Sequence, residues 1–333
     1  MAPRRLWVLN LDAEVELGRP KGYHPSQRTL RQLDPRLAEA ARLLAPGEPV
    51  VDPLAPTRVR LYPLVRAHEQ GAPDAIDSAT SYRKRQDVGS SSAGHAASDQ
   101  WASASTRGLQ GAAWCPTPYA LLCLARLGAV LPAAPPLGVL QSANSRLFCA
   151  QLGQTLPGAR FEVDPERAVR FLCAHQSDAW LLKRPLGFAG RGQRALYGAL
   201  RPDDHRFIEQ SADHGGLQIE PLVDIHLEVV IHGHIEPGGS FVLGPLRRQR
   251  VDAHRAWLNS GLLAPDDLSN EHAVRIHDEA ARVAAALHQL GYFGPFGMDA
   301  FVYKSRDGRF VLNPRSEINA RYCMGFALAE SRP

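Results

Sequence analysis

The sequence predicts a protein of mixed α/β and α+β architecture in two domains, and three observations lead to this prediction. The length of 333 residues corresponds to about two domains of about 150 residues each. The apolar segment Leu6-Trp7-Val8-Leu9 has the pattern of a buried strand, and a segment with helical spacing follows it. The second half contains several short strand patterns and one long amphipathic helix, an arrangement typical of α+β structure.

The first domain is expected over residues 1–140, as a small doubly wound-like unit. After the first strand, residues 28–45 carry apolar positions at helical spacing. Residues 74–110 are rich in serine and alanine and poor in apolar residues, which predicts a mobile insertion. A further helix is expected over residues 118–127, where a glycine ends it.

The second domain is expected over residues 141–333. Its long helix spans about residues 271–290, with Ser269 or Asn270 as the N-terminal cap. Asp307-Gly308 is a strong hairpin signal between the last two strands. The strand candidates are 179–183, 217–223, 226–232, 240–243, 297–303 and 309–313, and a shorter helical stretch is expected over 144–152.

Composition and charge argue against several classes of protein. The formal net charge is +4, but the basic residues are scattered and form no stripe interleaved with aromatic residues, so no nucleic-acid partner is expected. No apolar run approaches the roughly 18 residues of a membrane span, and polar residues interrupt the segment after the basic start, so neither a membrane protein nor a signal peptide is expected. Five cysteines without CxxC spacing argue against a disulfide framework and a cysteine zinc site, and favour a reducing cytoplasm.

Lys183 stands out because nearly all of the 38 basic residues are arginines. It ends an apolar strand and is followed directly by a loop that contains Gly187, Gly190 and Gly192. Glycines allow backbone N–H groups to point at one anion, and a lysine would place a charge on the same phosphates. The spacing is neither the Walker pattern nor GxGxxG, so a plain hairpin turn is the alternative for this segment taken alone.

The C-terminal segment has the residue types of a magnesium site. Glu317 and Asn319 are two residues apart and therefore share one face of an extended chain. A carboxylate and an amide oxygen side by side suit Mg²⁺, which takes hard oxygen ligands and accompanies phosphates. Arg321, on the same face, would reach a transferring phosphoryl group.

Asp299, on the preceding strand, is a second carboxylate for this site. With a two-residue turn at Asp307-Gly308, Asp299 would pair with Ser316, one residue short of Glu317. A three-residue loop, or a bulge at residues 313–314, would instead bring Asp299 and Glu317 onto one face. The sequence leaves these registers open.

Four segments, in this order along the chain, resemble the motifs of the ATP-grasp superfamily. They are Lys183 with the loop Gly187–Gly192, Glu220-Pro221-Leu222-Val223, Gly294-Pro295-Phe296-Gly297-Met298-Asp299-Ala300-Phe301, and Glu317-Ile318-Asn319-Ala320-Arg321. The resemblance covers about residues 140–326. It implies an ATP-grasp fold of two subdomains with ATP bound between them.

The resemblance also implies roles for single residues. The phosphates of ATP would be held by Lys183, by the loop with Gly187, Gly190 and Gly192, and by Arg146 in the position of an earlier phosphate-binding lysine. The hinge residues Glu220, Leu222 and Val223 would contact adenine. Glu317 and Asn319 would hold Mg²⁺, for which Mn²⁺ substitutes. The extra residues 313–316 leave open whether Asp299, Asn313 or neither completes the site.

Three further residues are candidates by position. Glu228 breaks an apolar strand and faces either the ribose or the protein surface. Arg248 and Arg250 share one periodic face of a basic cluster, and they either recognise an anionic substrate or acyl-phosphate or lie on a solvated surface.

The function that the resemblance implies is that of an ATP- and Mg²⁺-dependent ligase. Such an enzyme activates a substrate carboxylate as an acyl-phosphate, which an amine then attacks, as in amino-acid or peptide ligases. Arg321 would neutralise charge in the phosphoryl-transfer transition state. A phosphotransferase on the same fold and a nucleotide-binding module without catalysis are the alternatives. The sequence identifies neither the acid nor the amine, nor the oligomeric state.

Overall fold

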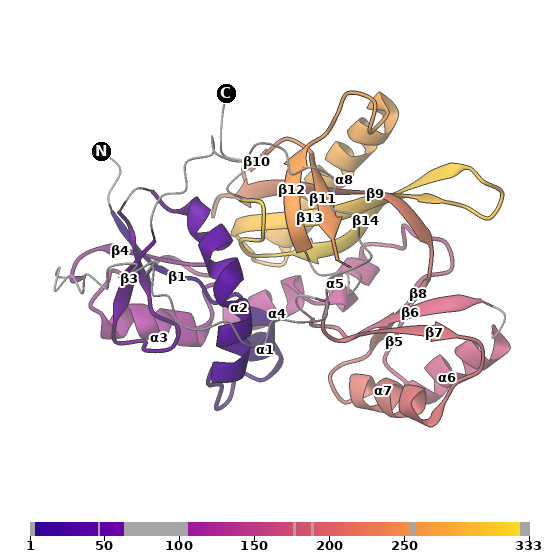
Figure 1. Ribbon diagram of the computed structural model, residues 1–333, viewed down its shortest axis with the longest axis horizontal. Coiled ribbons are helices and arrows are strands. Elements are labelled where there is room, and N and C mark those ends of the chain that lie inside the picture. The colour runs from indigo at the N-terminus through magenta and orange to yellow at the C-terminus, as the bar shows by residue number, and fades with distance from the viewer. Residues whose placement is uncertain are drawn as a thin grey trace, which may run out of the picture.

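The computed structural model describes residues 4–45, 47–62, 106–175, 178–187, 190–252 and 257–326, apart from the side chain of Pro35. These residues form three sheets with their covering helices (Figure 1). The expected insertion at 74–110 lies outside the described residues except for positions 106–110. Among the described helices, none combines the length and the apolar character that a membrane crossing requires.

The N-terminal unit is a four-stranded sheet of order β3-β2-β1-β4, in which β1 runs parallel to both β2 and β4. Leu6 and Trp7 of the central strand are fully buried, as their apolar run predicted. Ser26 caps the second helix by accepting a hydrogen bond from the backbone of Thr29. The elements are β1 (Arg5–Val8), α1 (Ala13–Gly18), α2 (Gln27–Ala40), η1 (Ala41–Leu43), β2 (Pro49–Val51), β3 (Val59–Leu61), β4 (Gln110–Ala113) and α3 (Pro118–Arg126).

Two short helices, α4 (Leu137–Ala143) and α5 (Arg146–Gln151), connect this unit to a small antiparallel sheet of order β5-β8-β6-β7. Its apolar core is formed with the helices α6 and α7, through residues such as Leu172 and Ile208. Asp164 caps α6 by accepting hydrogen bonds from the next turn. The elements are β5 (Arg160–Glu162), α6 (Pro165–Ala174), β6 (Ala179–Lys183), β7 (Gln193–Tyr197), α7 (Pro202–Ala212) and β8 (Leu217–Pro221).

The third sheet is antiparallel and has the order β12-β11-β9-β13-β14, with β10 paired to β9. The helix α8 packs against one face through its apolar side, and Ser269 rather than Asn270 is its cap. The opposite face of the sheet bears polar residues, among them Asp299 and Glu317. The elements are β9 (Asp224–Ile235), β10 (Phe241–Leu243), β11 (Arg247–Val251), β12 (Trp257–Leu262), α8 (Asn270–Gln289), β13 (Gly294–Lys304) and β14 (Phe310–Asn319).

The hairpin of β13 and β14 contains both of the features that the sequence left open, a three-residue loop and a bulge in β14. Its loop has three residues, because Ser305 and Arg309 still pair through a 2.8 Å backbone hydrogen bond, and Gly308 takes a left-handed φ of 84°. Further along, Phe301 pairs with Asn313 while Asp299 pairs with Glu317, so β14 has extra residues between these pairs. This irregularity places Asp299 directly opposite Glu317.

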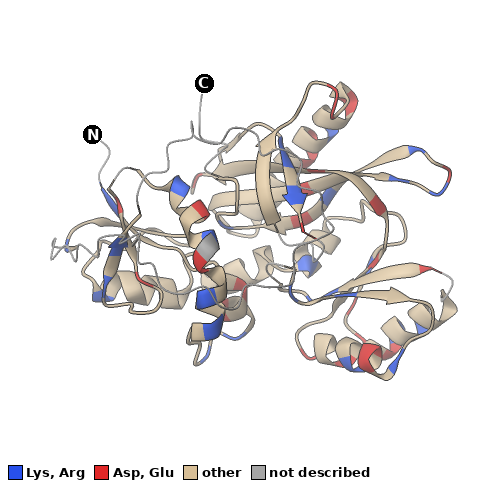
Figure 2. Ribbon diagram, viewed as in Figure 1, with Lys and Arg blue, Asp and Glu red and all other residues tan. Residues whose placement is uncertain are grey.

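The expected fold class agrees with this architecture, whereas several elements were not expected. The helices α1, α4, α6 and α7 were not expected, nor were short and charged strands such as β11. Residue 140, where the domain boundary was drawn, lies inside α4, and the division into two domains stays a prediction. Figure 2 shows Lys and Arg interspersed with Asp and Glu over all three sheets, in keeping with the scattered charge of the sequence.

Candidate active site

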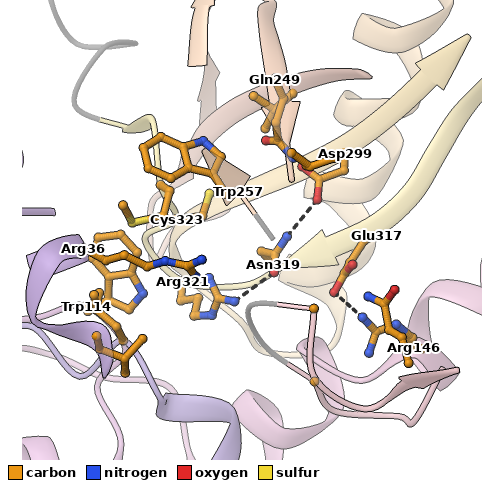
Figure 3. A pocket seen from close by; sticks show the side chains of 18 residues that line it. Arg36, Trp114, Arg146, Gln249, Trp257, Asp299, Glu317, Asn319, Arg321 and Cys323 are labelled. Atoms are coloured by element: carbon orange, nitrogen blue, oxygen red, sulfur yellow. Dashed lines mark hydrogen bonds and ion pairs between the residues drawn. The ribbon is translucent and has the colours of Figure 1, made fainter. Parts of the chain in front are cut away.

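Two adjacent cavities meet above the polar face of the six-stranded sheet. The first lies between this sheet and the N-terminal unit, and the second lies between this sheet and the small sheet. Figure 3 shows side chains that line the first cavity. Five residues line both cavities: Gln193, Gln249, Val251, Asp299 and Glu317. The two carboxylates therefore lie at the junction of the cavities.

Asp299 is surrounded by other carboxylates. Glu317 is its cross-strand partner on β14, and Glu228 lies diagonally across on β9, two residues before the pairing partner Val230. Burial, and then the charges of Glu317 and Glu228, raise the pKa of Asp299 to about 8, against smaller opposite effects of Arg321 and Lys183. Glu228 lines the second cavity, so it faces the site rather than the outer surface.

These residues fit a divalent cation. Asn319 donates a hydrogen bond from Nδ2 to Oδ2 of Asp299 at 3.4 Å, so the amide lies beside the carboxylates. Within the described part of the chain, no group of three or more His, Cys, Asp and Glu side chains is arranged to hold a metal, and the set here is two carboxylates and an amide. Oxygen donors of this kind suit Mg²⁺, and a dication would relieve the repulsion that raises the pKa of Asp299.

Asn313 does not lie with this set. It is buried and lines a neighbouring cavity beside Arg315 and Ser316, away from the junction of the first two cavities. Of the two residues that the sequence left open as a further metal ligand, Asp299 is the one that the structure brings to Glu317 and Asn319.

Two cations flank the carboxylates. Lys183, at the end of β6, has its Nζ 2.7 Å from Oε2 of Glu220, and both side chains are about nine-tenths buried. Arg146, the first residue of α5, donates from Nη2 to Oε1 of Glu317 at 2.8 Å and from Nη1 to the Arg184 carbonyl at 2.8 Å. The guanidinium thus ties the carboxylate cluster to the start of the glycine-rich loop.

The glycine-rich loop connects β6 to β7 beside the first cavity. A Cβ on Gly187 would lie 2.6 Å from the Arg191 carbonyl oxygen, so the backbone approach there requires glycine. Gly187 and Gly190 line the cavity, whereas Gly192 does not; its carbonyl accepts a hydrogen bond from Arg184 and closes the loop. Residues 188–189 lie outside the described residues.

The second cavity has an apolar wall next to a buried ion pair. Leu181, Val223, Ile225 and Phe301 line it together with Lys183 and Glu220. Glu220 is only 8% exposed, which excludes a solvent-facing position. Leu222 does not line the cavity, and its backbone N–H donates to the Ala179 carbonyl at 2.8 Å. The structure therefore brings Glu220 and Val223 to this cavity but leaves Leu222 outside it.

Arg321 is held by a residue from the other end of the chain. Its Nε donates to Oε1 of Glu14 at 2.6 Å, and its Nη2 donates to Oδ1 of Asn319 at 3.0 Å. Burial lowers the pKa of Arg321, but the Glu14 carboxylate together with the Cys323 and Cys115 thiols outweighs this effect, and the net pKa is raised. The guanidinium is therefore charged, fixed and adjacent to the proposed metal ligands (Figure 3).

Arg248 and Arg250 line neither of the two cavities, but both line a further cavity that shares Glu228 and Gln249 with the second one. Their role toward an anionic substrate or acyl-phosphate stays a prediction. Arg248 pairs across the sheet with the core residue Val229 and forms an ion pair with Asp267 at 3.2 Å. Arg250 lies two residues further along β11, on the same face of the strand as Arg248, and is exposed. The neighbouring Gln249, which pairs with Glu228, is the residue of this strand that lines both cavities.

Several lining residues were not found from the sequence. Gln249 lies between Arg248 and Arg250 in the basic cluster. The face of the sheet on which it lies depends on the pairing of β11 with β9, which the sequence does not show. Arg36 and Trp114 line the first cavity from the N-terminal unit, where Glu14 pairs with Arg321, and none of the three lies in a local motif. Trp257, on β12, lines the first cavity from the other side.

Comparison with known proteins finds similarity only among solved structures. No protein-family model matches the sequence, and no curated protein matches it. N5-carboxyaminoimidazole synthetase from Staphylococcus aureus, complexed with ADP, is similar at 13% identity and a TM-score of 0.42, over 63% of this chain and 53% of that one. Biotin carboxylase from Campylobacter jejuni is similar at 15% identity and a TM-score of 0.48, over 65% of this chain and 48% of that one.

A third similar structure is N5-carboxyaminoimidazole ribonucleotide synthetase from Thermus thermophilus, at 22% identity and a TM-score of 0.41, over 62% of this chain and 52% of that one. These proteins are ATP-grasp enzymes, the superfamily whose motifs the sequence resembles. The chain spans about half the length of each of them. The likeness is one of overall arrangement at low identity, and we therefore build the functional proposal on the side chains of the site.

Proposed function

We propose that the protein is an ATP- and Mg²⁺-dependent ligase that activates a substrate carboxylate as an acyl-phosphate for attack by an amine. One observation supports this proposal above all: the carboxylates of Asp299 and Glu317 lie where two separate cavities meet. A phosphoryl-transfer site needs this arrangement, because donor and acceptor approach the same charged centre from opposite sides.

In this proposal the second cavity receives ATP. Its apolar wall at Val223, Ile225 and Phe301 suits the flat adenine ring. Lys183 would contact the phosphates as a compact charge, and Arg146 would contact them as a planar fork. Both cations now pair with carboxylates, so the phosphates would share them with Glu220 and Glu317.

Asp299, Glu317 and Asn319 would hold Mg²⁺ at the junction, and Mn²⁺ offers the same preference for oxygen ligands. The ion, when bound, offsets the negative charge of the β- and γ-phosphates. Gln249 lines the same junction and Glu228 lines the second cavity, and both would contact the nucleotide, from β11 and β9 respectively.

The first cavity would receive the acid. One carboxylate oxygen attacks the γ-phosphorus, the bond to the β-γ bridging oxygen breaks, and ADP leaves. Arg321 would neutralise the charge that spreads over the transferring group, since it is fixed beside Asn319. The amine then attacks the carbonyl carbon and releases inorganic phosphate, which gives an amide without a covalent enzyme intermediate.

The test is ATP turnover with a panel of carboxylic acids in the presence of Mg²⁺, with and without hydroxylamine. The proposal expects acid-dependent ADP release and a hydroxamate from the trapped acyl-phosphate. A phosphorylated alcohol formed without any amine would favour the phosphotransferase instead. ATP binding without turnover on any acid would favour the nucleotide-binding module. The small-molecule partners and a cytoplasmic location stay predictions.

A further inference from the structure

Arg36 presents a charged group to the first cavity from the N-terminal unit. It lies on α2, whose apolar side chains pack into the core, and Arg36 itself is half-buried at the cavity wall. Figure 3 shows its side chain extending from the helix toward Arg321. The guanidinium thus lies on the side of the cavity opposite the nucleotide-binding residues.

Arg36 differs from the other arginines of this cavity in having no ion pair or hydrogen bond to any described residue. Arg146 is paired with Glu317, and Arg321 is paired with Glu14. The nearby carboxylate of the same helix, Asp34, pairs with Arg60 instead. A guanidinium in a cavity without a carboxylate partner in the described protein has its donors available for an anion from solution.

The walls beside Arg36 are aromatic and apolar. Trp114 is 3% exposed and packs against Tyr322, with ring centroids 6.4 Å apart. Trp257 lies across the cavity, and its indole N–H already donates to Oγ of Ser260 at 2.9 Å. Leu33 and Met324 complete this wall. Indole rings favour flat apolar groups, and a thioether adds contacts to aromatic rings.

We propose that Arg36 binds the carboxylate of the substrate acid and that Trp114 and Trp257 hold an aromatic or bulky apolar body attached to it. This inference rests on the proposed function, and it names the substrate class of that site. The carboxylate lies between Arg36 and Arg321, on the side that faces Asp299. Small hydrophilic acids such as acetate satisfy the arginine but leave the apolar wall of the cavity uncovered.

The inference is tested by binding, apart from turnover. The probe is 3-phenylpropionate, measured by ligand-detected NMR titration against the full chain with Mg²⁺ and ADP. Acetate lacks the phenyl ring and therefore tests the contribution of the apolar body. The amide 3-phenylpropanamide lacks the negative charge and therefore tests the contribution of the carboxylate. We expect 3-phenylpropionate to bind at least about 10-fold more tightly than 3-phenylpropanamide, because a charge-assisted hydrogen bond is worth about 10- to 150-fold. We expect a preference of at least about 10-fold over acetate as well, because burial of the phenyl ring removes apolar surface from water.

Two variants separate the two parts of the site. Arg36→Gln removes the preference for 3-phenylpropionate over its amide, and Trp257→Ala removes the preference over acetate. Arg31→Gln is the matched control, since Arg31 is an exposed arginine of the same helix that does not line the cavity. ADP affinity stays within about twofold in all three variants, because the changes lie outside the second cavity.

Equal effects of Arg36→Gln and Arg31→Gln, or equal affinities for acetate and 3-phenylpropionate, overturn the inference. Failure of the proposed function has a different signature. In that case ADP does not bind, or no acid gives a hydroxamate, whatever the outcome of the titrations with the three probes.

Discussion

Asp299 lies directly opposite Glu317 across the antiparallel pair of β13 and β14, with Glu228 on the adjacent strand as a third carboxylate on the same face. Like charges placed directly across a sheet are destabilising unless a cation lies between them. Arg146 neutralises Glu317 from one side, but the pKa of Asp299 is still raised to about 8 by burial and by the two glutamates. The protein therefore keeps a carboxyl group where its ionised form is unfavourable, which is typical of a site that binds a cation.

The first prediction concerns the stability of the protein without metal. Asp299 ionises near 3.8 in the unfolded chain and near 8 in the folded one, so the unfolded state binds fewer protons between these pH values. Stability then falls with rising pH by up to about 1.4 kcal/mol per pH unit from this group. Asp299→Asn should therefore raise the free energy of unfolding at pH 8 in EDTA, measured by urea denaturation.

His232 provides the internal control for this pH series. Burial lowers the pKa of His232 to about 4 from 6.5, so the unfolded state binds more protons below pH 6.5 and stability falls as the pH is lowered. Asp299→Asn should keep this loss on the acid side while it removes the loss between pH 6.5 and 8. A variant whose stability follows the original chain at every pH would show that Asp299 carries no such penalty.

The second prediction concerns the metal. Glu317→Gln keeps the shape and one acceptor oxygen, so the hydrogen bond from Arg146 survives in weakened form. It removes one negative charge from a set that must hold a dication, so the Mg²⁺ concentration for half-maximal ATP turnover should rise at least about 10-fold. Higher Mg²⁺, or Mn²⁺, should recover part of the activity. Asn319→Ala should act in the same direction, whereas an unchanged Mg²⁺ dependence in both variants would contradict the assignment.

The third prediction concerns the nucleotide. Lys183→Ala should weaken ATP binding about 10- to 150-fold, because it removes a charge-assisted contact worth roughly 1.5–3 kcal/mol. It also leaves the buried Glu220 carboxylate without its cation, so a second variant, Lys183→Met with Glu220→Gln, keeps the core neutral. Both should lose ATP affinity in isothermal titration. Loss only in the single variant would assign Lys183 to stability rather than to phosphate binding.

Local sequence patterns predicted the parts of the site that one segment builds by itself. The apolar strand ending at Lys183, the helix α8 with its Ser269 cap, and the spacing of Glu317 and Asn319 each depend on neighbours in the chain. The glycine loop was also found, because close backbone approaches select glycine.

The remaining features depend on pairings between distant segments. The two extra residues of β14 between the Phe301 and Asp299 pairs set the register that brings Asp299 opposite Glu317. The pairing of β11 with β9 likewise sets Gln249 opposite Glu228 and Arg248 opposite Val229, which the sequence of β11 alone does not show. Glu14 and Arg36 reach the site only through packing of the N-terminal unit, for which no local pattern exists.

The last prediction tests that packing through the ion pair of Glu14 and Arg321, which joins α1 to the end of β14. Both side chains are almost fully buried, so Glu14→Gln leaves a guanidinium without its counter-ion and should cost about 3–5 kcal/mol of unfolding free energy. A matched control is Asp203→Asn, which breaks an exposed ion pair with Arg206 and should cost less than about 1 kcal/mol. The double variant Glu14→Leu with Arg321→Met should recover most of the stability, since apolar side chains can replace a buried ion pair. The same variant should lose ATP turnover, because the transition state loses the cation that neutralises its charge. Equal small losses in Glu14→Gln and Asp203→Asn by urea denaturation would show that the pair contributes little, and full turnover in the double variant would remove Arg321 from the mechanism.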